Sequence, residues 1–281
     1  MREVNVALIT EAVRKLSIEA NYFLGADIKK SLEKSRKEET FELAGQVLDK
    51  IILNSEIACK EEMPICQDTG MACVFLEIGQ DVHFIGGNLE EAINEGVRRG
   101  YKEGFLRKSV VEDPIRRVNT KDNTPAIIYY DIVDGDKVKI TLAPKGFGSE
   151  NMSRIGMLKP SDGLEGVKNF IIETVKSAGP NPCPPMVVGV GIGGTFDKAA
   201  YLAKKALIRP INTSNKDEFY KNLEIELLDK INKLGIGPQG FGGKTTALGL
   251  NIETYPTHIA GLPVAVNINC HATRHKEAVI W

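Results

Sequence analysis

The chain has 281 residues, of which 42% are hydrophobic and 26% are charged, an ordinary composition for a globular protein. Its formal net charge is −1 and its pI is about 6.5, so its bulk charge does not favour nucleic-acid or membrane-surface binding. No stretch of about 18 apolar residues occurs, and we expect no membrane span. Residues 1–20 place charges within a short apolar stretch, unlike a signal peptide, which predicts a cytoplasmic protein.

The first third of the chain combines helices and strands. Apolar residues recur at helical spacing within residues 4–58, with a break at Gly25 and a charged, solvated stretch over 29–40. Residues 71–87 are typical of strands, and residues 88–105 of a helix that Asn88 caps. We therefore expect an N-terminal helical segment followed by mixed elements.

The middle of the chain contains the strongest hairpin signal. Residues 124–146 hold two β-rich runs joined by Asp134, Gly135 and Asp136, a sequence typical of a tight turn. Two adjacent runs with such a turn predict an antiparallel hairpin.

Helices alternate with buried strands in the second half. Periodicity predicts helices over 167–179, 196–208 and 218–235, and strands over 186–192, 246–255 and 262–271. This alternation predicts a fold of the α/β class, or mixed α+β. We expect a lobe boundary in the loops near residues 150–165.

Two glycine-rich segments are similar to nucleotide-binding motifs. Gly189, Gly191 and Gly194 match the dinucleotide pattern G-x-G-x-x-G, but residues 200–216 contain no acidic residue to bind a ribose. Residues 237–249 are similar to a phosphate-binding loop, but Pro238 stands where the template requires glycine. Both departures argue against a nucleotide. The glycines serve either tight turns or the close approach of backbone amides to an anion.

The five cysteines do not predict a disulfide framework, because their number is odd and the chain has no sign of secretion. Cys59 and Cys73 lie in apolar runs typical of the core, whereas Cys66, Cys183 and Cys270 lie in polar, loop-like contexts. Their spacing matches no local zinc or ferredoxin pattern. The spacing leaves two interpretations of the cysteines open. They form a metal site assembled from distant loops, or they are small side chains buried in the core.

Six ordered motifs together resemble one family. They are PICQDTG, RVNTKDNTPA, APKGFGSEN, NPCPP with VGVGIGGTFDKA, GPQGFGGKTTALG and HIAGLPVAVNINCHATRH. The chain is similar, from about residue 5 to its end, to the α subunit or N-terminal catalytic region of the class I, iron–sulfur-dependent fumarate hydratase and tartrate dehydratase family. The resemblance implies one two-lobed catalytic domain over residues 1–281, with mixed sheets.

The resemblance implies a [4Fe–4S] cluster held by Cys66, Cys183 and Cys270. Three thiolates bind three irons and leave the fourth iron to act as a Lewis acid on the substrate. The implied reaction is the reversible, oxygen-sensitive hydration of fumarate to L-malate, a step of the tricarboxylic acid cycle, with dehydration of L(+)-tartrate as the alternative. No nucleotide takes part.

Further site residues transfer from the same motifs, and Arg107 transfers from the segment GFLRKS. Gln67 and Asp68 are expected to bind substrate, with Arg107 as a carboxylate fork and Gly148 as a backbone amide donor. Asp68 and His258 are the expected catalytic residues, with His258 as an acid–base group or as the partner of Asp68. A histidine that merely caps a strand start is the alternative for His258.

The resemblance also implies a partner chain. Single-chain members continue into a further domain that supplies additional substrate ligands and the favoured base, whereas this sequence ends at Trp281. We expect a separate β subunit with that C-terminal-type domain, a homodimer of α chains within an α2β2 assembly, a dicarboxylate substrate, and no nucleic acid or membrane partner. A nucleotide-binding protein and an assembly subunit with structural cysteines are the competing hypotheses.

Overall fold

The computed structural model describes all residues from Met1 to Trp281 and divides into two compact units. Unit 1 comprises Met1–Leu24, Ser55–Gly146 and Arg274–Trp281, and unit 2 comprises Gly25–Asn54 and Phe147–Thr273. Each unit combines helices with a four-stranded mixed sheet, and neither sheet closes into a barrel. The expected mixed α/β fold is therefore confirmed. No helix is long and apolar enough to cross a membrane.

The sheet of unit 1 has the strand order β10-β5-β2-β4. These strands are β10 (Lys276–Ile280), β5 (Val138–Lys145), β2 (Met71–Gly79) and β4 (Ile127–Val133). Strand β2 pairs in parallel with β4 and antiparallel with β5, and all but two of its residues are buried. It therefore forms the centre of the sheet.

The hairpin prediction for residues 124–146 is wrong, although both of its strands exist. Strand β2 lies between β4 and β5, and the connecting turn closes around the end of β2. Gly79 N donates to Lys137 O at 2.8 Å, and Asp81 N donates to Gly135 O at 3.0 Å. A Cβ atom at Gly79 would lie 2.3 Å from Gly135 O, so glycine permits the turn to close there.

Two helices, α1 (Val6–Tyr22) and α4 (Leu89–Glu103), pack together in unit 1. The side chain of Asn5 caps α1, and Asn88 caps α4 by accepting from Glu91 N at 3.0 Å, as expected. The helices approach closely because Cβ atoms at Gly96 and Gly100 would lie 2.6 and 2.7 Å from carbonyl oxygens of α1. Strands β1 (Arg2–Asn5) and β3 (Val82–Ile85) form a short parallel pair, in which β1 precedes α1 and β3 precedes α4 in the sequence.

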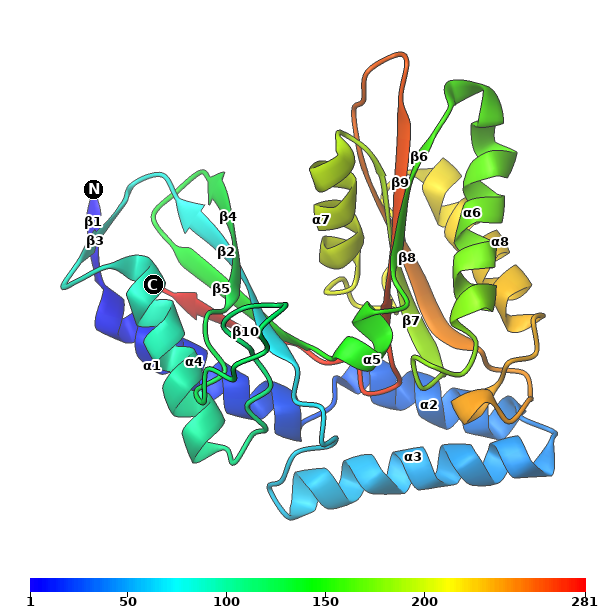
Figure 1. Cartoon of the computed structure of the whole chain (residues 1–281), viewed down its shortest axis with the longest axis horizontal. Helices are drawn as coiled ribbons and strands as arrows, with labels where there is room; N and C mark the ends of the chain where they lie inside the picture. The colour runs from blue at the N-terminus through cyan, green and yellow to red at the C-terminus, as the bar shows by residue number, and fades with distance from the viewer. The chain divides into compact units, whose positions relative to one another are not determined.

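The sheet of unit 2 has the strand order β6-β9-β7-β8. These strands are β6 (Arg154–Leu158), β9 (Leu262–Asn269), β7 (Met186–Gly193) and β8 (Ala247–Tyr255). Every residue of β7 is buried, as its apolar run predicts. Helix α7 (Phe196–Ala206) covers one face, whereas α6 (Gly163–Ala178) and α8 (Glu218–Asn232) cover the other (Figure 1).

The remaining elements are helical. Unit 2 includes α2 (Ala26–Glu38), most of α3 (Glu42–Lys60) and the single turn α5 (Phe147–Glu150). Two short 3-10 turns lie at Pro160–Asp162 and Pro238–Gly240. The chain also changes unit between Gly146 and Phe147, a few residues before the expected boundary region.

Two of the three dinucleotide-like glycines, Gly189 and Gly191, have a packing role inside β7, whereas Gly194 follows the strand with φ +67°. A Cβ atom at Gly189 would lie 2.2 Å from Ala203 O, and one at Gly191 would lie 2.1 Å from Ala199 O. Both carbonyls belong to α7, so these glycines allow the helix backbone to approach the strand. The pattern is thus explained without a dinucleotide.

We expect Gly191→Ala to lower the free energy of unfolding by about 1–3 kcal/mol, because the added methyl would overlap the backbone of α7. Urea unfolding followed by circular dichroism measures the change. Gly261→Ala is the matched control, because its Cβ would have no neighbour closer than 3.7 Å. Equal unfolding midpoints for the two variants would refute the packing role.

Candidate functional site

The residues expected in the site fall into two groups, one in each unit. Unit 1 holds Cys66, Gln67, Asp68 and Arg107, and unit 2 holds Gly148, Cys183, His258 and Cys270. All five cysteines of the chain are free thiols. The local surroundings of each group follow from the contacts within its own unit.

The Cys66 loop of unit 1 is a compact turn built on side chain to backbone hydrogen bonds. Asp68 N donates to Cys66 Sγ, and the thiol donates to Gln67 Oε1, each at 3.4 Å. Asp68 Oδ1 accepts from Gly70 N at 3.0 Å, which is a typical Asp turn. Gly70 has φ +68°, and its Cβ would lie 2.6 Å from Lys145 O, so this loop approaches β5 closely.

Three side chains from distant parts of unit 1 hold the carbonyls of residues 68–70. Arg274 Nη2 donates to Asp68 O at 2.6 Å, Tyr101 OH donates to Thr69 O at 2.7 Å, and Asn123 Nδ2 donates to Gly70 O at 3.0 Å. Tyr101 and Asn123 are fully buried, and burial raises the pKa of the Tyr101 hydroxyl, which keeps it a neutral donor. Each backbone carbonyl from Asp68 to Gly70 is therefore satisfied by a side chain from elsewhere in unit 1.

The sequence did not predict that these three side chains would support the Cys66 loop. Asn123 lies in RVNTKDNTPA and Arg274 in HATRH, so both stand inside motifs that carry the resemblance. Tyr101 gives no such signal, because it occupies an apolar position on the buried face of α4.

Arg107 lies on the loop that follows α4, and its guanidinium is exposed. Its backbone carbonyl accepts from Thr69 Oγ1 at 2.9 Å, which ties Arg107 to the Cys66 loop. The side chain makes no ion pair or hydrogen bond with the rest of the chain, so its fork is available to an anion.

In unit 2, Cys183 lies beside the segment that carries Cys270. The Cys183 carbonyl accepts from His271 N at 3.2 Å, and His271 Nδ1 lies 3.0 Å from the same oxygen. Cys183 is exposed and Cys270 is half-buried. Two thiols from residues far apart in the sequence thus belong to neighbouring loops.

Gly148 lies in α5, close to the Cys183 loop. A Cβ atom at this position would meet only Asn181 O, at 3.8 Å, so the surroundings of its backbone are open. Glu150 fixes this helical turn through two bonds of 2.7 Å, one from Lys204 on α7 and one from Asn267 on β9.

His258 lies in the exposed connection between β8 and β9. Its Nδ1 accepts from Ala260 N at 3.2 Å, and its carbonyl accepts from Gly261 N at 2.9 Å. Within unit 2 these contacts make His258 a turn residue, and its catalytic role stays a prediction.

The two cysteines expected in the core differ from each other. Cys73 is buried in β2, as predicted, whereas Cys59 is exposed on α3, so the core prediction for Cys59 is wrong. The apolar neighbours of Cys59 in the sequence belong to other faces of the helix, since adjacent residues on a helix point in different directions.

The donor set fits an iron–sulfur cluster chemically. Cys66, Cys183 and Cys270 are free thiols on loops, and thiolate sulfur is the ligand that such a cluster requires. No group of three His, Cys, Asp or Glu side chains is already gathered as a metal site. Unit 2 holds two of these thiols on neighbouring loops, and unit 1 holds Cys66.

The second nucleotide-like segment is bound to a carboxylate of the chain itself. Lys244 N donates to Glu39 Oε2 at 2.7 Å, and Thr40 N and Phe41 N donate to Glu39 Oε1. Burial raises the pKa of Glu39, but these backbone donors and the charge of Lys244 lower it more, so the net pKa lies below its usual value. An amide that could bind phosphate therefore has an internal partner.

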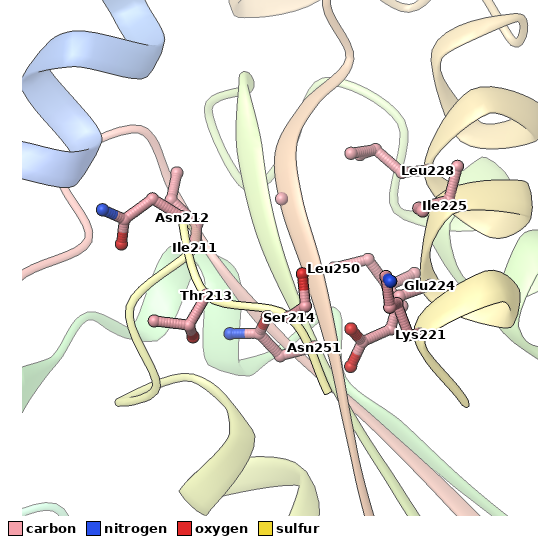
Figure 2. A pocket seen from close by; sticks show the side chains of 11 residues that line it. Ile211, Asn212, Thr213, Ser214, Lys221, Glu224, Ile225, Leu228, Leu250 and Asn251 are labelled. Carbon is pink, nitrogen blue, oxygen red and sulfur yellow. The ribbon is translucent and has the colours of Figure 1, made fainter. Parts of the chain in front are cut away.

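A separate pocket of about 180 Å³ in unit 2 lies between residues 211–214, α8 and the edge strand β8 (Figure 2). Its polar lining includes Glu224, which is buried and pairs with Arg209. Glu224 also accepts from Ile252 N at 2.8 Å. No residue expected in the site lines this pocket, and its buried charge is already neutralised.

Comparison with known proteins defines the class. A model of the fumarate hydratase (Fumerase) family matches residues 10–279, so the protein is a hydro-lyase. The chain belongs to the fumarate hydratase family, which confirms the resemblance.

Curated relatives match over most of their length. A Methanocaldococcus jannaschii protein, named provisionally as L(+)-tartrate dehydratase subunit alpha, is 47% identical over 272 residues, which is 95% of each chain. The L(+)-tartrate dehydratase subunits alpha of Escherichia coli O157:H7 and Shigella sonnei are each 32% identical over 276 residues, covering 97% of this chain and 90% of the relative.

We expect Glu39→Gln to weaken the acid dependence of stability. Because the folded pKa of Glu39 is lowered, its contribution is present above the unfolded pKa of about 4.3 and is lost as pH falls through the folded value. Urea unfolding at several pH values between roughly 6 and 3 should give the variant a shallower decline than the wild type. Glu33→Gln, which removes a charge without these hydrogen bonds, should keep the wild-type slope; if Glu39→Gln keeps it too, the assignment fails.

Proposed function

We propose that the chain is the α subunit of an L(+)-tartrate dehydratase that carries a [4Fe–4S] cluster. The observation that carries this proposal is the 47% identity, over 95% of both chains, to a relative that bears that name. Hydration of fumarate, the leading expectation from the sequence, becomes the alternative, supported by the description of the family.

The proposed reaction removes water from a four-carbon dihydroxy dicarboxylate. A hydroxyl leaves one carbon and a proton leaves the adjacent carbon, and the resulting enol becomes a 2-oxo dicarboxylate without net redox. When bound by Cys66, Cys183 and Cys270, the cluster would supply a Lewis acid for the departing hydroxyl.

The chain's own residues bind and orient the substrate in this proposal. Arg107 pairs with one carboxylate through its free fork, and the Gly148 amide donates to an anionic oxygen. Gln67 contacts the substrate from the Cys66 turn. Asp68, whose carbonyl and carboxylate are both fixed by hydrogen bonds, receives or passes a proton in concert with His258.

A separate β subunit completes the site in this proposal. The relatives are named as alpha subunits, which supports a partner chain carrying further substrate ligands and the base. We propose an α2β2 assembly in which two α chains also contact each other. Isolated α chains would then bind the cluster but turn over little substrate.

The cluster assignment predicts separable effects of cysteine substitutions. After anaerobic reconstitution with iron and sulfide, the wild type should absorb broadly near ~400 nm and bleach in air. Alanine at Cys66, Cys183 or Cys270 should abolish this absorbance, because each removes a thiolate ligand. Alanine at Cys59, exposed on α3, is the control and should keep it. A colourless wild type that instead binds NAD or ATP would favour the nucleotide-binding hypothesis.

The substrate assignment predicts a preference that kinetics can measure. The α chain co-expressed with its β subunit should dehydrate L(+)-tartrate with a higher kcat/KM than it shows for fumarate, L-malate or mesaconate. The α chain alone should be nearly inactive with each. Higher kcat/KM with fumarate would support the alternative, and full activity of the α chain alone would exclude the shared site.

A further inference from the structure

The loop that carries Cys183 cannot satisfy its own backbone carbonyls. Pro182, Pro184 and Pro185 lack N–H groups, and the Cys183 N–H is already used, since it donates to Pro180 O at 3.0 Å. The carbonyls of Cys183 and Pro184 therefore need donors from other segments.

Gln239 supplies two of these donors. Its backbone N and its side-chain Nε2 both donate to Pro184 O, at 2.7 and 2.9 Å. The same Nε2 lies 3.1 Å from His271 Nδ1, and His271 follows Cys270 directly. One side chain thus contacts the segments of both thiols in unit 2.

The backbone conformations at this contact need support from their surroundings. Cys183 has φ +54° and Gln239 has φ +53°, both in the left-handed region that disfavours side chains. Glycine would adopt the conformation at position 239 more readily, but it would lose the side-chain amide that holds Pro184.

Two glycines let the segment containing Gln239 pack against the Cys183 loop. A Cβ atom at Gly240 would lie 2.4 Å from the Cβ of Pro180, and one at Gly237 would lie 1.8 Å from Gly242 O. The first glycine permits the contact between segments, and the second permits the segment to close on itself. The glycine pattern that is similar to a phosphate-binding loop thus has a role in packing.

We propose that Gln239 is a positioning residue that holds Cys183 in its left-handed conformation and fixes it to the segment of Cys270. This deepens the proposed function, on which it rests for the cluster that the two thiols would bind. The contacts involve only residues of this chain, so they can be tested without the cluster.

The first test measures the alkylation rate of each cysteine in metal-free full-length protein, using iodoacetamide and peptide mass spectrometry. Gln239→Glu keeps the length but replaces the Nε2 donor with an oxygen, and Gln239→Gly keeps the backbone donor and the left-handed φ. Both should raise the Cys183 rate by about fivefold, because losing one hydrogen bond raises by about this factor the fraction of molecules in which the exposed thiol leaves its fixed conformation. Both should leave the Cys59 rate unchanged. Phe241→Leu, whose side chain is exposed in the same segment, should match the wild type.

Thermal unfolding checks that each variant is folded. If Gln239→Glu does not fold, Gln239→Gly alone provides the test. A wild-type Cys183 rate in the folded Gln239 variant or variants would overturn the proposal. After reconstitution, the folded variants should bleach faster in air and give an altered electron paramagnetic resonance signal. If Cys183→Ala still forms the cluster, the proposed function fails, but an altered Cys183 rate in the Gln239 variants would still support the role of Gln239. If the cluster requires Cys183 but the Gln239 variants alkylate like the wild type, the role of Gln239 fails and the proposed function stands.

Discussion

Both cysteine-bearing turns depend on the same constraint, which is that their carbonyls must be satisfied by donors from outside the turn. In unit 1 the carbonyls after Cys66 accept from Tyr101, Asn123 and Arg274. In unit 2 the carbonyl of Pro184 accepts from Gln239, and the carbonyl of Cys183 accepts from His271. A backbone held in this way restricts the positions open to its cysteine, which would reduce the entropy lost if the thiolate bound a metal.

Glycine in this chain mainly permits close approach between backbones. Gly191 lets α7 approach β7, and Gly240 lets its segment meet Pro180, with both contacts too short for a Cβ atom. Nucleotide-binding folds use glycines of the same spacing for the same steric reason, with a phosphate in place of a neighbouring chain. The spacing alone therefore cannot distinguish the two uses. The hydrogen-bond partner of the loop amide can distinguish them, and here Lys244 N donates to the carboxylate of Glu39.

Local signals predicted the elements well, and non-local contacts limited the rest. Helical periodicity and the Asn88 cap located α4, and the continuous apolar run located β7. The hairpin failed because β2, about fifty residues earlier in the sequence, pairs with both of its strands, and local turn chemistry contains no information about such insertion. The supports of the Cys66 turn were missed for the same reason, since Arg274 lies 206 residues from Asp68.

The choice between tartrate and L-malate, the hydrated form of fumarate, depends on one hydroxyl group, and its energetics are asymmetric. A site built to hydrogen-bond that hydroxyl rejects an analogue without it strongly, because the site's buried polar group is left unpaired. A site lined by apolar groups rejects the extra hydroxyl only weakly. A tartrate enzyme should therefore be selective, with a polar partner for the second hydroxyl. In the proposed enzyme Gln67 is a candidate, because its Oε1 accepts from the Cys66 thiol at 3.4 Å, and a thiolate bound to the proposed cluster would no longer donate to it.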